Sequence, residues 1–211
     1  MTTQHDESTL RDRKRRRTRQ MLIEAAAELF EHKGYDETTV AEIAAAAEIG
    51  TRTFFSYFAS KEEILFPESE ARTRAAIDAI TSRQPDDRPI DVLLHAVRHI
   101  VQADTDMVSP MARIRLHLMR TVPAIQGRVL RLQQQAQRDI ARHLHAAFPD
   151  HLDEIDAGAL VGALIGAISG ALLVLLEDPE LAEQLAERPN EIGARIHNAA
   201  ERALSPWATT P

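Results

Sequence analysis

Residues Thr39–Lys61 read TVAEIAAAAEIGTRTFFSYFASK, and this stretch decides the fold of the first third of the chain. Thr39 is followed three residues later by Glu42, which is the spacing of a capping box, so we expect a helix to begin at Val40. This helix is expected to end near Glu48. Its small apolar face consists of Ile43, Ala44 and Ala47.

A second short helix is expected at about 51–58. Gly50 and Thr51 are both accepted at an N-cap, so this pair offers a helix start. Phe54 and Phe58 lie four residues apart and therefore share one face of the helix. The other face is formed by Arg52, Thr53, Phe55, Ser56 and Tyr57.

Two short helices joined by a tight turn, with the second polar on its outer side, form a helix-turn-helix. In this motif the second helix enters the major groove of DNA, and its first residues meet the base edges. The stretch resembles the DNA-binding domain of the tetracycline-repressor (TetR) family of bacterial transcription regulators, whose pattern runs T-V-x-x-I-A-x-x-A-G-V-S-x-x-T-x-Y-x-Y-F-x-x-K-E. The matching positions are Thr39, Val40, Ile43, Ala44, Ala47, Thr53, Tyr57, Phe58, Lys61 and Glu62. An ordinary three-helix packing unit is the alternative that so many matches disfavour.

Three positions depart from this pattern. Glu48 stands where the family usually has Gly, so a turn with positive φ there would strain a residue that carries a side chain. Gly50 replaces the usual Ser and leaves Thr51 as the better cap. Phe55 replaces Tyr and lacks the hydroxyl that would reach a phosphate.

The resemblance implies an all-α homodimer of about nine helices: an N-terminal three-helix DNA-binding domain and a larger C-terminal domain for ligand binding and dimerisation. Such a protein binds a palindromic operator in double-stranded DNA and releases it when a small-molecule effector enters the larger domain. Roles carried over from the family put Thr51, Arg52 and Thr53 near bases, with Arg52 the candidate for guanine. The remaining DNA-binding candidates of the motif are Thr39, Phe55, Ser56, Tyr57 and Lys61, of which Thr39, Ser56, Tyr57 and Lys61 would hold phosphates.

Composition sets the class of protein. The chain has 211 residues, which is enough for a small domain and a larger one. It contains no cysteine, which excludes disulfides and thiolate metal sites. The N-terminus has no apolar run, so we do not expect secretion. We expect a cytoplasmic location instead.

The net charge of −7 conflicts at first sight with DNA binding, but the basic residues are concentrated. Residues 10–20 hold seven basic side chains and one acid, directly before a helical pattern that begins at Gln20 and ends at Gly34. Arg15, Arg16 and Arg17 are therefore candidates for contact with phosphates or the minor groove. A solvated helix end is the alternative.

Domain boundaries follow from the aromatic residues, of which seven of nine lie between positions 30 and 66. We expect a polar tail at 1–9, the DNA-binding domain at 10–66, the ligand-binding and dimerisation domain at 67–204, and a second tail at 205–211. A third helix should begin at Lys61 and bend at Phe66–Pro67, because proline removes a backbone hydrogen bond.

No arrangement of residues in the chain indicates catalysis, a metal site or a cofactor. Asp91, His95 and His99 lie four residues apart, which is compatible with metal ligands. However, this line falls nearly opposite the apolar face of the expected helix 90–103, so solvent exposure explains it better. The sequence therefore predicts a protein that is not an enzyme.

An excess of arginine marks residues 111–145, which contain seven arginines and one acid. A polar helix surface paired with acids elsewhere is one explanation; an anion-binding site is the other, since guanidinium suits carboxylate and phosphate. The segments RTFFSYFASKEEILF and ARIRLHLMRTVPAI resemble the TetR subgroup whose C-terminal domain binds an acyl-CoA-like ligand. That resemblance implies a fatty acyl-CoA effector, and the candidate residues are Arg113, Leu116, Met119, Arg120 and Arg128.

Residues 157–176 read AGALVGALIGAISGALLVLL and form the most apolar run of the chain. Its length would span a membrane, but acids flank both ends and no membrane association is expected. Glycines every four residues form a smooth strip on which a second subunit could pack. The dimer-interface candidates are Gly158, Gly162, Gly166 and Gly170, with Ile192 and Ile196 on the last helix.

A second class of function stays open at this point. The chain could be a soluble helical protein that binds a lipophilic or metal ligand without operator-specific DNA binding.

Overall fold

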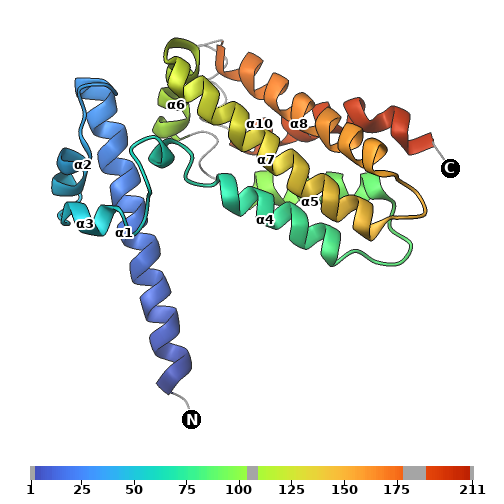
Figure 1. The fold of residues 1–211 in the computed structure, drawn as a ribbon, viewed down its shortest axis with the longest axis horizontal. Helices are drawn as coiled ribbons and strands as arrows, with labels where there is room; N and C mark the ends of the chain where they lie inside the picture. Colours follow the sequence, from blue (N-terminus) through green and yellow to red (C-terminus); the bar gives the residue numbers. More distant parts are fainter. Residues whose placement is uncertain (1–2, 104–108, 178–188, 210–211) are drawn as a thin grey trace. The chain divides into compact units, whose positions relative to one another are not determined.

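The computed structural model describes residues 3–103, 109–177 and 189–209, and these contain nine α-helices, two short 3₁₀ segments and no strand (Figure 1). The all-α class expected from the sequence is confirmed. The chain divides into two compact units, a head of residues 1–67 and 110–121 and a body of residues 68–109 and 122–211.

The head is built on α1 (Thr3–Lys33), the longest helix of the chain. α1 begins inside the stretch expected to be a polar tail, and the basic residues that follow lie within it as helix. Gly34, at φ +89°, ends α1 as the sequence predicts, because glycine adopts this backbone conformation without steric cost.

The helix-turn-helix follows as α2 (Val40–Ala46) and α3 (Thr51–Phe54), which lie beside α1 in Figure 1. Both halves of the predicted capping box form: the Thr39 hydroxyl accepts from the Glu42 N–H, and the Thr39 N–H donates to the Glu42 carboxylate. Large apolar side chains fill the core beneath: Leu22, Phe30, Ile43, Phe54, Phe58, Ile64 and Leu65.

The expected third helix is divided at Pro67. Only a 3₁₀ turn, η1 (Glu63–Leu65), precedes the proline, and α4 (Ser69–Thr81) follows it. The predicted break is therefore present, but the helix before it is shorter than expected.

The head also contains α6 (Pro110–Thr121), which the sequence-based boundary assigns to the body. α6 packs against α1 and η1. Its Arg115 guanidinium donates to the Leu65 carbonyl and lies 5.7 Å from the Phe66 ring centroid. This long-range contact is the reason that a contiguous head at 10–66 is incomplete.

The body is a bundle of α4, α5 (Pro89–Ala103), α7 (Pro123–Ala147), α8 (Glu154–Glu177) and α10 (Pro189–Leu204), followed by a 3₁₀ segment, η3 (Ser205–Thr209). α8 packs between α7 and α10. Trp207 packs against the body core, so the stretch expected to be a frayed tail is anchored as far as Thr209. The sequence also predicts a polar connection at 178–189, which lies almost wholly outside the described residues.

The glycines of α8 do not form one strip. An α-helix turns by about 100° per residue, so residues four apart drift by about 40° around the axis. The carbonyl of Gly158 accepts from Gln137 of α7, and a Cβ added at Gly162 would lie 2.8 Å from the same side chain. Gly166 and Gly170 are exposed, and a Cβ added at either would have no neighbouring atom within 4 Å.

Two of the proposed interface residues on α10 are buried within the chain itself. Ile192 and Ile196 belong to the body core. Their place in the apolar stripe was predicted correctly, but the stripe packs on α5 and α8 of the same subunit. Ile192, Ile196 and Gly162 are therefore no longer candidates for contact with a second copy of the chain.

The turn between α2 and α3 confirms the strain expected at Glu48. Glu48 has φ 56°, and the surrounding hydrogen bonds form a Schellman motif, from Ile49 N–H to the Ala44 carbonyl and from Glu48 N–H to the Ala45 carbonyl. The residue at this position adopts the left-handed conformation, which costs a non-glycine residue about 1–2 kcal/mol.

We expect Glu48→Gly to stabilise the protein by about 0.5–1 kcal/mol, because glycine relieves this strain although it loses more chain entropy on folding. Ala45→Gly, in the preceding exposed turn of α2, is the matched control and should destabilise by a similar amount. Urea unfolding midpoints measure both. A loss of stability in Glu48→Gly equal to that in the control would contradict the argument.

Candidate nucleic-acid interface

The predicted reading face of the helix-turn-helix is exposed. Thr51, Arg52 and Thr53 are open to solvent, whereas Phe54 and Phe58 are buried beneath them with ring centroids 5.8 Å apart. Among the described residues, none makes a hydrogen bond or ion pair with the Arg52 guanidinium. The first turn of α3 therefore presents a free cation between two hydroxyl groups.

Beyond α3 the backbone tightens rather than continuing as regular helix. α3 ends at Phe54 instead of near Phe58, and the next hydrogen bonds, from Ser56 to Thr53 and from Tyr57 to Phe54, span three residues. Ser56 is exposed, with its hydroxyl donating to the Thr53 carbonyl, and Tyr57 is half-buried. Phe55 is 54% exposed and packs edge-on against Phe54 at 5.4 Å.

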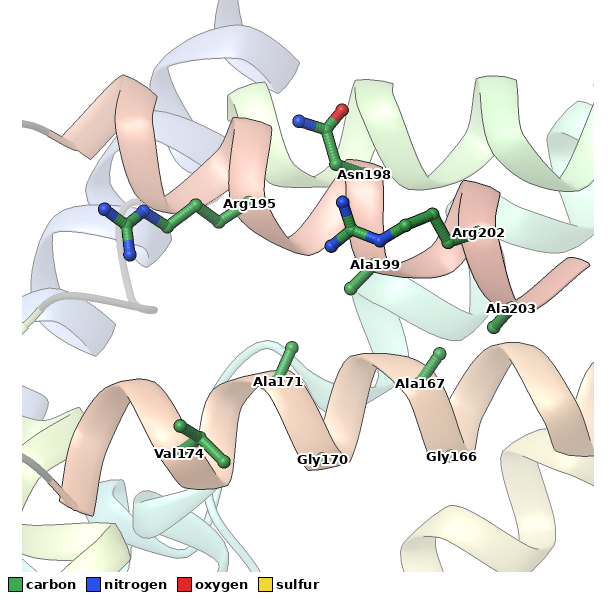
Figure 2. Close-up of a pocket in the computed structure, with 10 residues that line it drawn as sticks. All are labelled: Gly166, Ala167, Gly170, Ala171, Val174, Arg195, Asn198, Ala199, Arg202 and Ala203. Carbon is green, nitrogen blue, oxygen red and sulfur yellow. The ribbon is translucent and has the colours of Figure 1, made fainter.

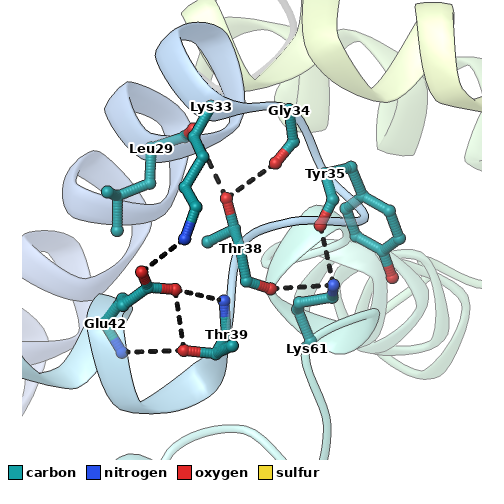
Figure 3. Close-up of polar contacts among 8 residues, drawn as sticks. All are labelled: Leu29, Lys33, Gly34, Tyr35, Thr38, Thr39, Glu42 and Lys61. Atoms are coloured by element: carbon teal, nitrogen blue, oxygen red, sulfur yellow. Dashed lines mark hydrogen bonds and ion pairs between the residues drawn. The ribbon is translucent and has the colours of Figure 1, made fainter.

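A polar network supports the turn that carries α2 (Figure 3). Thr38 is only 1% exposed, and its hydroxyl donates to the Gly34 carbonyl at 2.7 Å. The Glu42 carboxylate accepts from Lys33 and Thr39, and these hydrogen bonds lower the pKa of Glu42 to about 2. The network fixes the end of α1 to the start of α2.

Lys61 is half-buried and belongs to this network. Its ammonium group donates to the carbonyls of Tyr35 and Thr38 at 2.7 and 2.9 Å and lies 4.1 Å from the Tyr35 ring centroid. Burial, and then the nearby Glu62 carboxylate, raise the pKa of Tyr35. Lys61 therefore holds the turn together, and its expected role in binding phosphate stays a prediction.

The structural role of Thr38 was missed by sequence reasoning. A threonine directly before the cap Thr39 gave no distinct signal, because its partners, Leu29 and Gly34, lie on the preceding helix and its end.

The basic segment of α1 lies partly against this motif. The Arg15 guanidinium is 5.4 Å from the Tyr57 ring centroid, and its Nη2 donates to the Ser56 carbonyl at 3.5 Å. Arg19 lies 5.1 Å from the Phe58 ring centroid and donates to the Pro67 carbonyl. Arg16 and Arg17 are exposed but lie about 100° and 200° around the helix from Arg15, so the structure separates the three candidates.

The candidate ligand residues fall in both units. Arg113, Leu116, Met119 and Arg120 lie on α6 in the head, with Arg113 and Arg120 exposed, whereas Arg128 is half-buried on α7 in the body. Two grooves lie in the described part of the body, and neither is lined by any of these residues.

No group of three or more potential metal ligands occurs within residues 3–103, 109–177 and 189–209. Asp91, His95 and His99 are exposed, as predicted, and Asp91 forms a bidentate ion pair with Arg88.

An apolar groove of about 730 Å³ runs between α8 and α10 (Figure 2). Small side chains of α8 and α10 face each other across the groove, and Arg195, Asn198 and Arg202 also lie on α10. Gly166 and Gly170 line the groove, as does Val174, which is 64% exposed.

Helix α8 has the length and composition of a membrane span over Glu154–Val174, and 22% of its most apolar stretch is buried within this chain. The inner side of α8 carries Leu160, Val161 and Leu164 in the body core. One side of α8 is therefore covered by its own subunit, and the other is left apolar and open.

Residues 22–66 match the family model described as bacterial regulatory proteins, tetR family. The chain is also 35% identical over 150 residues to the HTH-type transcriptional regulator TcmR of Streptomyces glaucescens, an alignment that covers 69% of this chain and 66% of TcmR. The chain belongs to the TetR family. The matched stretch contains the last part of α1 together with α2, α3 and η1, so it includes the helix-turn-helix but not the basic segment of α1.

Several solved structures share the fold over most of the chain. A putative TetR-family transcriptional regulator from Syntrophomonas wolfei superposes with a TM-score of 0.60 at 17% identity, covering 90% of this chain and 96% of its own. A SmeT–triclosan complex gives 0.58 at 18% identity and 90% coverage of both chains; SmeT is the repressor of the Stenotrophomonas maltophilia multidrug efflux pump SmeDEF. Thermus thermophilus FadR, a TetR-family repressor in complex with lauroyl-CoA, gives 0.50 at 20% identity, covering 83% and 93%.

The TetR-family match to curated relatives is partial in length. The chain spans 66% of TcmR and 34% of the HTH-type transcriptional regulator HbdR of an Aromatoleum species, to which it is 34% identical over 85 residues. The likeness to solved structures, at no more than 20% identity in these three, shows the helical fold, and the interface described above supplies the chemistry.

Proposed function

We propose that this chain is a ligand-responsive transcriptional regulator, acting in the cytoplasm, which binds a palindromic operator as a homodimer. The observation that carries the proposal is the division of α3: Phe54 is buried, while Thr51, Arg52 and Thr53 are exposed within the segment that matches the family. A helix end that presents one arginine and two hydroxyl groups suits the major groove, where guanine offers two acceptors to a guanidinium.

Residues 10–66 act as the DNA-binding domain in this proposal, completed by α6. Contacts to phosphates come from the residues that flank the reading turn, namely Thr39, Ser56 and Tyr57, and from the basic part of α1. Such contacts set the position of the protein on the duplex, and the base contacts of α3 set the sequence. The concentrated basic segment explains how a chain of net charge −7 can bind a polyanion.

We expect Arg52→Ala to weaken binding to the preferred duplex by about 1–3 kcal/mol and to relax the sequence preference at one position of each half-site. Arg98→Ala, an exposed arginine on α5 of the body, is the control of equal charge change. Fluorescence anisotropy with duplexes mutated at each position measures both effects. A variant with unchanged affinity and unchanged sequence preference would show that α3 is not the reading helix.

A second copy of the chain is the partner proposed for the groove between α8 and α10. The groove is lined mostly by glycine and alanine, so the backbone of a facing helix can approach closely, and Leu173 and Val174 would lose their exposure to water. A two-fold dimer also doubles the base contacts, which one short α3 supplies only sparingly. Gly166 and Gly170 remain in the proposed interface; Gly158, which contacts α7, and Gly162, Ile192 and Ile196 do not.

We expect Gly170→Gln to raise the dissociation constant of the dimer at least tenfold, because overpacking costs about 1–3 kcal/mol and the symmetry applies the change twice. The fold of the subunit should survive, since an added Cβ meets nothing within 4 Å and glutamine favours helix over glycine.

Gly158→Gln is the matched control, because Gly158 lines the other groove, against α7. Sedimentation equilibrium distinguishes the two variants. Equal dimer affinities for Gly170→Gln, Gly158→Gln and wild type would remove this groove from the interface.

For the effector we propose a fatty acyl-CoA. Support comes from the excess of arginine on α6 and α7 and from the likeness in fold to a repressor bound to lauroyl-CoA. Arg128, which is half-buried on α7, is the candidate of this set that lies in the body, and the experiment is therefore directed at it.

Lauroyl-CoA should stabilise the protein by about 2.7 kcal/mol at a concentration one hundred times its dissociation constant. Coenzyme A alone and the uncharged lipophile triclosan provide the comparison, and Arg128→Ala should reduce the shift caused by lauroyl-CoA. Differential scanning fluorimetry measures this series. Stabilisation by triclosan alone would contradict the role of the arginines while leaving the DNA-binding proposal intact.

A further inference from the structure

The basic segment of α1 is helical, and its side chains are therefore sorted by face. Arg11, Arg15 and Arg19 lie four residues apart, so each is displaced by only about 40° around the helix from the last. The buried Leu22 and Ala26 continue the same face. One line of α1 thus passes from the core of the head into three successive arginines.

The two arginines of this line that lie nearest the core are already engaged with the helix-turn-helix. Arg19 lies over Phe58, at the buried end of the segment, and Arg15 lies over Tyr57 and donates to the Ser56 carbonyl. Arg11 is one turn further along the same line and is exposed. The line therefore runs along the segment that follows α3 and then extends beyond it.

We infer that α1 supplies a second line of contact to duplex DNA, formed by Arg11 and Arg15, and that Arg15 also positions the Ser56–Tyr57 segment. The ligand is the phosphodiester backbone next to the bases that α3 reads. This inference rests on the proposed function: within the basic part of α1 it names the face that makes the contacts, and it adds the positioning role of Arg15.

The chemistry of guanidinium allows Arg15 to do both tasks. The group carries five N–H donors in a rigid plane; one of these donates to the Ser56 carbonyl while the guanidinium carbon lies 5.4 Å from the Tyr57 ring centroid. The side chain is exposed, so other N–H groups can donate to a phosphate oxygen. A lysine could supply the charge but not the planar fork that spans a carbonyl, a ring and a phosphate.

The opposite face of α1 offers a control with the same chemistry. Arg13 is exposed and lies about 160° around the helix from Arg15. A contact that depends on the face of the helix will therefore distinguish Arg11 from Arg13, although both belong to the same run of positive charge.

The test measures the affinity of the intact protein for two duplexes across a series of KCl concentrations by fluorescence anisotropy. One duplex is that preferred by the wild type in selection from a random pool, and the other is a scrambled duplex of equal length. The proteins are the wild type, Arg11→Ala, Arg15→Ala, Arg15→Lys and Arg13→Ala. Removal of one cation that neutralises a phosphate should reduce the slope of log K against log salt by about 0.9, hence by about 1.8 for a dimer.

We expect Arg11→Ala to reduce the salt slope on both duplexes and Arg13→Ala to leave it unchanged. Arg15→Ala should reduce the slope and also reduce the ratio of selected to scrambled affinity by about tenfold, the lower part of what one base contact supplies. Arg15→Lys should restore the slope but not the ratio, because lysine keeps the charge and does not reproduce the interactions with Ser56 and Tyr57.

Equal reductions of the slope in Arg11→Ala and Arg13→Ala would overturn the inference, since the charge would then act without regard to face. A wild-type ratio in Arg15→Lys would overturn the positioning role. These outcomes leave the proposed function standing if the wild type prefers its selected duplex. A wild type that prefers no duplex would refute the proposed function itself, and this inference with it.

Discussion

The packing of Phe54 and Phe58 beneath α3 is the constraint on which the interface depends. Both side chains are fully buried in the head core, which fixes the rotation of α3 about its own axis. Helical periodicity then determines which residues lie away from the core, and Thr51, Arg52 and Thr53 are therefore exposed to solvent. The packing of the head core thus determines which side chains of α3 are exposed. These exposed side chains are the ones available to a duplex.

The two segments that flank the helix-turn-helix are held by hydrogen bonds made within the head. Thr38 and Lys61 occupy backbone carbonyls of the α1–α2 turn, and Arg15 reaches the Ser56 carbonyl from α1. Prior ordering of this kind lowers the entropic cost of binding, because the segments proposed to meet DNA do not need to be fixed at that moment. Cations in this protein therefore differ in their surroundings: Lys61 is half-buried and donates to backbone carbonyls, Arg15 is exposed and donates to one, and Arg52 is exposed.

Local chemistry was sufficient to predict part of the fold and of the interface. The capping box at Thr39, the helix end at Gly34 and the break at Pro67 each depend on residues within a few positions, so the sequence carries them directly. Features that depend on distant packing could not be predicted in this way. The structural contacts of Lys61 could not be predicted, because its carbonyl partners lie 23 and 26 residues away. Likewise, the apolar stripe of α10 was visible, but periodicity does not say whether a stripe meets its own subunit or a partner.

In the proposal, the apolar surface of the chain forms the dimer and the cationic surface binds DNA. Small residues on α8 and α10 leave a groove for a second copy, and the dimer then holds two α3 helices at one fixed separation. The most direct measurement is selection of duplexes by the intact protein from a random pool, followed by sequencing. An inverted repeat is the predicted result, with half-site centres one helical turn of DNA apart or a multiple of it. A pool without enrichment, or a single motif without an inverted partner, would contradict the account.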